Sequence, residues 1–177
     1  MKIGILNIGG NSASIWYALE RLGHKAVIIS KLTPFYDALV IPGQGRFDVG
    51  LDRISTETRE DILNFNRPVI GICLGMQLLF EESEEGTGRG LGVFKGRLIK
   101  LPATHIGWSK CSNENYYYFA HSYHVPSNWQ RFKDLVCKFE KIDFVASCHK
   151  DNFVGCQFHP EKSGKAGEEF LKMALKC

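Results

Sequence analysis

The sequence lacks any long hydrophobic run. Spanning a bilayer takes roughly 20 consecutive apolar residues, and no stretch of the chain approaches that length. The N-terminus, MKIGILNIGG, also lacks the longer apolar region and the small-residue cleavage site of a secretory signal. We therefore expect a cytoplasmic protein with no membrane partner, and we interpret the N-terminal run as a first buried strand.

An excess of charge of one sign is also missing. Lys and Arg number 22 and Asp and Glu 19, which leaves a net charge of +3, and the basic residues are scattered along the chain. Nucleic-acid-binding proteins typically gather such residues into a stripe, so we expect no nucleic acid partner. The 44% hydrophobic and 23% charged content is that of a globular chain, and the length predicts one domain over residues 1–177.

Metal-binding patterns of cysteine are absent. The six cysteines form no CxxC pair and no Cys/His cluster with zinc spacing, so we predict no metal site. Without a secretory signal the expected compartment is reducing, which predicts free thiols. The cysteines are Cys73, Cys111, Cys137, Cys148, Cys156 and Cys177.

The first half of the chain alternates short apolar strands with helices. Such alternation is typical of an α/β fold with a doubly wound, mostly parallel central sheet. Asn11 or Ser12 is expected to cap the first helix, and Gly23 to end it. The predicted strands are Lys2–Ile8, Ala26–Ile29, Ala38–Ile41 and Val69–Ile72, and the later predicted helices are Thr56–Phe65 and Met76–Phe80.

The second half changes style after a glycine-rich stretch over residues 86–96. Strand-like segments follow one another more closely there, which predicts a smaller antiparallel sheet. A closing amphipathic helix is predicted over Gly167–Lys176. The predicted strands of this half are Arg97–Leu101, Tyr116–Val125, Phe144–Cys148 and Phe153–Phe158.

The segment Gly71-x-Cys73-x-Gly75 follows an apolar strand and opens a helix. It is the cysteine counterpart of the Gly-x-Ser-x-Gly nucleophile elbow, in which glycines make room for a nucleophile on a strained turn. A lone cysteine in an apolar strand is more often simply buried. Glycines on both sides at a strand–helix junction favour a nucleophile instead, with the helix N-terminus stabilising its thiolate and the Leu74 N–H an oxyanion.

A cysteine nucleophile needs a base, and the base needs a partner that fixes its tautomer. In an extended chain residues two apart face the same side, so His159 and Glu161 are predicted to point together. An isolated His-Pro pair would more often be a solvated turn. His149 and Asp151 have the same spacing, and we interpret that pair as a polar hairpin turn.

Two of these segments resemble a known family. GICLGMQLLF around Cys73 and QFHPEKS around His159 resemble the two signatures of the class I (triad) glutamine amidotransferases, and PGQG at 42–45 resembles their oxyanion strand. Three further segments resemble the glutaminase subunits of imidazole glycerol phosphate synthases within that class. They are EGTGRGLGVFKGRLIKLP, HIGW and YYYFAHSYHV.

The resemblance implies a role for each motif residue. Cys73 attacks the side-chain amide of glutamine, His159 transfers the proton and Glu161 orients the histidine. Backbone N–H groups of Leu74 and of the Gly43 region hold the oxyanion, and no cofactor is needed. The positions that match the family's glutamine-holding residues are Gly45, Gln77, His121, Ser122 and Tyr123.

The same resemblance implies a protein partner. In these synthases ammonia passes to a (β/α)8-barrel cyclase subunit, which adds it to a phosphoribulosyl-formimino nucleotide precursor and makes imidazole glycerol phosphate for histidine biosynthesis. We therefore expect a heterodimer. Tyr118 and Lys162 match positions on the side that faces the partner.

Some features depart from the family pattern and leave alternatives open. The stretch Asn7–Asn11 is one residue shorter than usual, and Gln44 replaces a small apolar residue. A paralogue that supplies ammonia to another synthase, for example in surface-sugar biosynthesis, fits these changes. A non-catalytic regulatory module and a cysteine peptidase or related hydrolase are the alternatives from other classes. Taken alone, Gln77 could be a surface helix residue and Lys162 a solvated charge.

Overall fold

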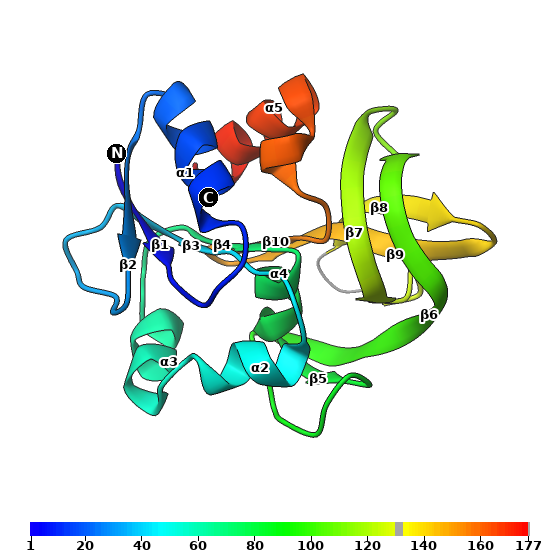
Figure 1. The fold of residues 1–177 in the computed structure, drawn as a ribbon, viewed down its shortest axis with the longest axis horizontal. Coiled ribbons are helices and arrows are strands. Elements are labelled where there is room, and N and C mark those ends of the chain that lie inside the picture. The colour runs from blue at the N-terminus through cyan, green and yellow to red at the C-terminus, as the bar shows by residue number, and fades with distance from the viewer. Residues whose placement is uncertain (130–132, 177) are drawn as a thin grey trace.

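A computed structural model describes residues 1–129 and 133–176. Its main element is a seven-stranded sheet in the order β2-β1-β3-β4-β10-β9-β8 (Figure 1). The pairs from β2 to β10 are parallel, and β9 and β8 add antiparallel pairs at one edge, which confirms the predicted mostly parallel sheet. The strands are β1 (Lys2–Leu6), β2 (Lys25–Ile29), β3 (Ala38–Ile41), β4 (Val69–Ile72), β8 (Lys133–Phe139), β9 (Ile142–Lys150) and β10 (Phe153–Cys156).

Helices cover both faces of this sheet, as a doubly wound fold requires. In Figure 1, α1 (Ser12–Arg21) and α5 (Gly164–Ala174) lie above the sheet, and α2 (Phe47–Asp52) and α3 (Thr56–Leu63) lie below it with α4 (Leu74–Leu79). The buried hydrophobic residues of α1 and α5 belong to one hydrophobic cluster, and those of α2, α3 and α4 belong to another. Within the described ranges, no helix is long and apolar enough to cross a membrane.

The smaller sheet consists of β5 (Phe80–Ser83), β6 (Phe94–Lys110) and β7 (Tyr116–His124). Strands β6 and β7 pair antiparallel, as predicted for the smaller sheet, whereas β5, which was not predicted, pairs in parallel with β6. The last two predicted strands join the main sheet instead, as β9 and β10. Strand β10 lies between β4 and β9, and all four of its residues are buried there. The packing of the whole chain places it between these strands, because its local sequence pattern specifies no particular neighbour.

Several short elements were not predicted: α2, β5, β8 and the 3-10 turn Pro160–Lys162. The predicted helix over Met76–Phe80 begins earlier, at Leu74, and ends before Phe80, which starts β5. The Phe80 ring lies 5.2 Å from the rings of both Phe94 and Trp129, and this aromatic cluster holds it in an extended backbone.

The prediction that all the cysteines are free thiols is wrong for two of them. Cys111, just after β6, forms a disulfide with Cys137 on β8, and their Cα atoms are 4.3 Å apart. Cys73, Cys148 and Cys156 are free and buried, and Cys177 lies outside the described residues. The expectation rested on the compartment, whereas the pairing follows from a β-bridge that brings residues 26 positions apart face to face.

Candidate active site

Cys73 occupies a strained turn between β4 and α4. Its φ of +53° and ψ of −107° are rare for a residue with a side chain, and its N–H donates to the Cys156 carbonyl at 2.7 Å. The strand ends at this point because Cys73 turns the chain into the helix. The backbone strain predicted for a nucleophile elbow is therefore present.

The flanking glycines make this turn possible. A Cβ on Gly71 would lie 2.7 Å from the backbone carbon of Gly75, closer than real Cβ atoms approach. A Cβ on Gly75 would collide with the Ile41 carbonyl of the neighbouring strand. Both positions need glycine because backbone passes directly over them, as the sequence pattern predicted.

The Cys73 sulfur is buried and faces polar groups. The side chain of Gln157 donates to Sγ at 3.6 Å, and Sγ lies 3.7 Å from the Ala120 carbonyl. Gln157 is fully buried and was not predicted as a site residue. A signal for it was available, since Gln157 stands two residues before His159 in an extended segment and so faces the same side.

His159 and Glu161 point together, as predicted. The His159 ring nitrogen Nδ1 lies 2.9 Å from Glu161 Oε1, and both side chains are almost completely buried. Strand β7 anchors His159, because the His159 N–H donates to the Tyr118 carbonyl at 2.8 Å. The Ser163 hydroxyl donates to the His159 carbonyl at 2.6 Å. A solvated His-Pro turn is ruled out by this burial.

A further residue holds the same carboxylate. The side-chain amide of Asn11 donates to Glu161 Oε1 at 2.7 Å. Asn11 precedes α1, where we predicted a capping role, but among the described residues its side chain makes no capping bond. The sequence could not reveal this contact because it joins positions 150 residues apart.

The charge state of His159 follows from its surroundings. Burial lowers the pKa of His159, but interactions with the Cys73 sulfur and with Glu161 more than offset this and raise it to about 10. Its Nε2 atom makes no hydrogen bond to any described residue, so it is available for proton transfer. The arrangement therefore favours a protonated imidazole ring at His159, beside Glu161 and Cys73.

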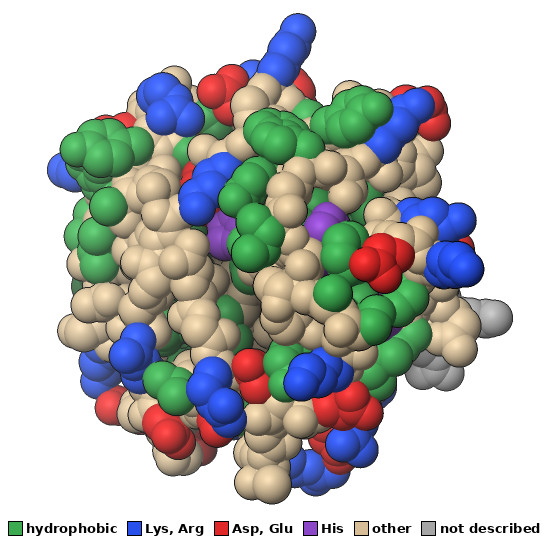
Figure 2. Space-filling view, turned by 45° about the vertical axis from the view of Figure 1, so that its right-hand side comes forward, with side chains coloured by type: hydrophobic (Ala, Val, Ile, Leu, Met, Phe, Trp, Pro, Cys, Tyr) green, Lys and Arg blue, Asp and Glu red, His purple; other side chains and the backbone are tan. Residues whose placement is uncertain are grey.

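A cavity of about 330 Å³ opens beside the sulfur. Most of the predicted substrate-binding residues line it together with Cys73, whereas Gly43 does not. The predicted residues in its lining are Gly45, Leu74, Gln77, His121, Ser122 and Tyr123. The lining also includes Gln44, Glu85, Thr104, Ile106 and Ala120, which were not predicted as substrate-binding. In the space-filling view of Figure 2, histidine side chains are visible near the centre of the molecule.

The predicted oxyanion segment lies against the start of α4. A Cβ on Gly43 would lie 2.8 Å from Leu74 Cβ, and Gly45 has a φ of +109° that favours glycine. The N–H of the first helical residue, Leu74, has no partner within a helix. A Cβ on Gly10 would lie 2.6 Å from the Gln44 nitrogen, so the shortened N-terminal loop packs directly on this segment.

The sequence profile of the family described as "Glutamine amidotransferase class-I" matches residues 9–176. The chain belongs to this family. It is 39% identical to the "Imidazole glycerol phosphate synthase subunit HisH" of Prochlorococcus marinus subsp. pastoris, over 99% of the chain and 98% of that protein. It is 40% identical to the protein of that name from Caldanaerobacter subterraneus subsp. tengcongensis, over 96% and 95%, respectively.

Solved structures of low sequence identity share the amidotransferase fold. A putative GMP synthase subunit from Thermoplasma acidophilum has a TM-score of 0.73 at 21% identity, covering 99% of this chain and 92% of that one. A structure described as a glutamine amidotransferase has a TM-score of 0.73 at 18% identity, covering 97% and 98%. At these identities the likeness supports the fold alone.

Gln77 of this amidotransferase is not a surface helix residue, so that alternative is wrong. It is buried, and its side-chain nitrogen donates to the Tyr123 carbonyl at 3.2 Å and to Gln157 Oε1 at 3.1 Å. Because both contacts use the nitrogen, Gln77 Oε1 is the side-chain atom left for a ligand.

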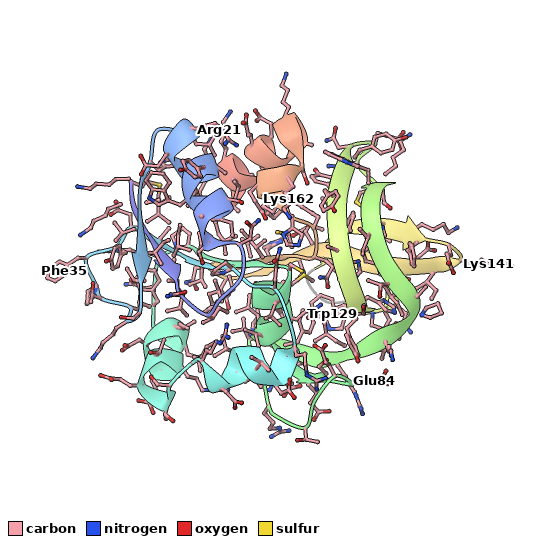
Figure 3. The ribbon with its side chains drawn as sticks, in the orientation of Figure 1. Arg21, Phe35, Glu84, Trp129, Lys141 and Lys162 are labelled. Carbon is pink, nitrogen blue, oxygen red and sulfur yellow. A yellow bond between two sulfur atoms is a disulfide. The ribbon has the colours of Figure 1, made fainter. Side chains whose placement is uncertain are left out.

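The predicted partner-facing residues of the amidotransferase lie together at the surface. Lys162 Nζ lies 5.6 Å from the centre of the Tyr118 ring, and the Trp108 ring lies 6.0 Å from that ring. Figure 3 places Lys162 on the segment that leads into α5, next to β7. Trp108 is 55% exposed, and the Tyr118 ring lies 6.4 Å from that of His159. This surface therefore adjoins the buried pair His159–Glu161.

Two other sequence predictions concern metals and His149. The described residues contain no group of three or more His, Cys, Asp or Glu side chains placed to hold a metal ion. His149 is the penultimate residue of β9 and stands just before the hairpin turn into β10, as predicted. Its Nδ1 atom lies 2.6 Å from Asp134 rather than bonding Asp151.

Proposed function

We propose that this chain is the glutaminase subunit of an imidazole glycerol phosphate synthase, with Cys73, His159 and Glu161 as its catalytic triad. The observation that carries the proposal is the buried pair His159–Glu161 beside the strained Cys73, next to a cavity that holds the residues matching the family's glutamine positions. The chain forms a single amidotransferase domain and acts in the cytoplasm without a cofactor.

The first half-reaction forms a thioester. The Cys73 thiolate attacks the side-chain amide carbon of glutamine, forming a C–S bond and a tetrahedral oxyanion. Backbone N–H groups of Leu74 and of the Gly43–Gly45 segment stabilise the oxyanion. His159 donates the Nε2 proton to the amide nitrogen, the C–N bond breaks and ammonia leaves. Glu161 keeps the imidazole oriented while its charge changes.

The second half-reaction restores the enzyme. His159 is then neutral and takes a proton from a water molecule, whose oxygen attacks the thioester carbon. The C–S bond breaks, glutamate leaves and Cys73 returns as a thiolate beside protonated His159. The raised pKa of His159 supports this resting state, because the imidazolium is ready to protonate the leaving nitrogen.

The ammonia is passed to a (β/α)8-barrel cyclase subunit that forms a heterodimer with this chain and makes imidazole glycerol phosphate. Similarity to HisH subunits over almost the whole chain supports this partner. The exposed aromatic surface with Trp108, Tyr118 and Lys162 is the docking side, because it adjoins the triad and combines apolar area with a cation.

The test is glutamate release by the chain co-purified with a barrel cyclase, comparing wild type with Cys73→Ala. We expect the variant to lose activity at least 1,000-fold, as for other nucleophile deletions. Unchanged glutamate release would refute the assignment of Cys73. Release of glutamate without imidazole glycerol phosphate would point to another ammonia acceptor, the paralogue alternative.

A further inference from the structure

Two buried histidines outside the triad lie side by side on neighbouring strands of the smaller sheet. His105 on β6 and His121 on β7 are register partners, and His105 Nδ1 lies 3.0 Å from His121 Nε2. The far nitrogen of each ring also has a partner. His105 Nε2 lies 2.8 Å from the Ser109 hydroxyl, and His121 Nδ1 lies 2.8 Å from the Tyr123 carbonyl.

The chemistry of these partners determines both tautomers. A carbonyl oxygen only accepts, so His121 must carry its proton on Nδ1. A neutral His121 then accepts at Nε2, so His105 must donate from Nδ1. The Ser109 hydroxyl in turn donates to His105 Nε2. One arrangement of protons satisfies all three contacts, and it runs in one direction from Ser109 to Tyr123.

The surroundings keep both rings neutral. The His105 ring stacks between Phe119 at 4.8 Å and Phe139 at 4.3 Å. Burial lowers the pKa of His105 to about 4 and is the largest influence on His121, whose pKa falls to about 3. Neither ring therefore carries charge at neutral pH, and the pair acts through hydrogen bonds and shape.

The chain of hydrogen bonds continues to the nucleophile. The Tyr123 carbonyl accepts from Gln77 as well as from His121, at 3.2 Å and 2.8 Å. The Gln77 amide also donates to Gln157 Oε1, which orients the Gln157 amide nitrogen toward the Cys73 sulfur. Every link in this chain joins buried or half-buried groups, and it ends at the reacting atom.

We propose that His105 is a positioning residue for the Cys73 site. By donating to His121 it fixes the Tyr123 carbonyl, from which the Gln77 and Gln157 amides extend to the sulfur. The effect on glutamine hydrolysis rests on the proposed function, whereas the arrangement of the hydrogen bonds and its effect on Cys73 do not.

Two substitutions separate the donor from the packing. His105→Phe keeps an aromatic ring between Phe119 and Phe139 but cannot donate to His121. His105→Asn loses the ring, yet its side-chain amide retains a donor near the position of Nδ1. His149→Phe is the matched control, because His149 is exposed and its ring pairs with Asp134 rather than with any residue of this hydrogen-bond chain.

We expect His105→Phe to lower kcat/KM for glutamine about tenfold, which is the size expected for losing one buried hydrogen bond. Most of the change should be in KM, because His121 and Tyr123 line the cavity. His105→Asn should stay within about threefold of wild type. Equal kinetics for His105→Phe and His149→Phe, or a larger loss in His105→Asn than in His105→Phe, would overturn the proposal.

Two further measurements do not depend on glutamine. In ¹⁵N NMR of the wild-type chain, both rings should show the proton on Nδ1, and a proton on Nε2 of either ring would overturn the proposal even if every variant failed to fold. The rate of Cys73 alkylation by iodoacetamide, read at that residue by mass spectrometry, should change at least threefold in His105→Phe and not in His149→Phe. If wild type did not hydrolyse glutamine, the proposed function would fail while these two results would still decide the role of His105.

Discussion

At the scale of single residues, one oxygen atom connects the N-terminal loop to the proposed triad. Glu161 Oε1 accepts from His159 and from Asn11, and Oε2 is buried with no partner among the described residues. A buried carboxylate with so few donors depends strongly on each of them, because removing one leaves charge uncompensated in a region of low dielectric constant.

Asn11→Ala should therefore impair catalysis without altering any group that touches glutamine. We expect kcat to fall about 10- to 100-fold, the range for a hydrogen bond to a buried charge. Glutamate release by the complex with the cyclase measures this. Asn66→Ala, at an exposed position, serves as the control and should match wild type. Full activity in Asn11→Ala would show that His159 alone keeps the carboxylate oriented.

His159 also predicts how stability depends on pH. The pKa of His159 is 6.5 in an unfolded reference and about 10 in the folded chain. Burial alone would lower this pKa, but the interactions with Cys73 and Glu161 raise it by more than burial lowers it. Between these values the native state holds a proton that the unfolded state lacks, so the free energy of unfolding falls as pH rises. The contribution is complete below pH 6.5 and lost above about pH 10.

Urea unfolding would not isolate this contribution, because the proposed resting thiolate of Cys73 lacks a proton that the unfolded thiol holds, and this offsets the proton gained by His159. A ¹⁵N NMR titration of the His159 ring measures its pKa directly, and the ring should stay protonated on both nitrogens until the pH approaches about 10. A ring that is already neutral at about pH 8 would contradict the raised pKa.

At the scale of elements, the junction of β4 and α4 depends on close backbone contact. Gly75 lies under the Ile41 carbonyl of β3, so any side chain there must push the helix off the sheet. The Cys73 turn, the oxyanion segment and the cavity all rest on this junction. Its glycines are therefore structural requirements of the site rather than reactive groups.

Gly75→Ala should lower the free energy of unfolding by about 2–4 kcal/mol, because the added methyl overlaps backbone that cannot move aside. Gly86→Ala is the control, since its added Cβ would meet the partly exposed Asp48 side chain at 3.2 Å. Chemical denaturation compares the two. A loss in Gly75→Ala no larger than in Gly86→Ala would mean that the helix can shift at little cost.

At the scale of the whole molecule, the two sheets meet around the site. Cys73 directly follows β4 and His159 lies just beyond β10 of the main sheet, whereas His121 and Tyr123 lie on β7 of the smaller sheet. The disulfide from Cys111 to Cys137 fastens the end of β6 to β8 and so links the two sheets covalently. Relative movement of the sheets would otherwise change the distance between nucleophile and cavity wall.

Removing this link in Cys111→Ala/Cys137→Ala should lower the free energy of unfolding by about 3.5 kcal/mol, the value expected from closing a loop of this length in the unfolded chain. Denaturation with and without a thiol reductant measures it. The wild type should lose stability in reductant, whereas the double variant should not respond. A wild type that ignores reductant would argue against the disulfide.

The fold class and the local placement of Cys73, His159 and Glu161 could be predicted without any coordinates. Apolar runs bounded by glycine and proline located β1 to β4, and short-range spacing identified Cys73 between its glycines and His159 beside Glu161. These features are local. A strand, an elbow or an i, i+2 pair depends on residues that are neighbours in the chain, so their physical requirements are written in the sequence.

Which distant groups meet depends instead on how the whole chain packs. The placement of β10 between β4 and β9, the pairing of Cys111 with Cys137 and the bond from Asn11 to Glu161 join positions far apart in the chain. Their local sequences are compatible with other partners: a buried strand can pair in either direction, and an asparagine before a helix can cap it. Burial in the folded molecule selects one partner for each of these groups, because a buried polar group without a hydrogen bond costs free energy.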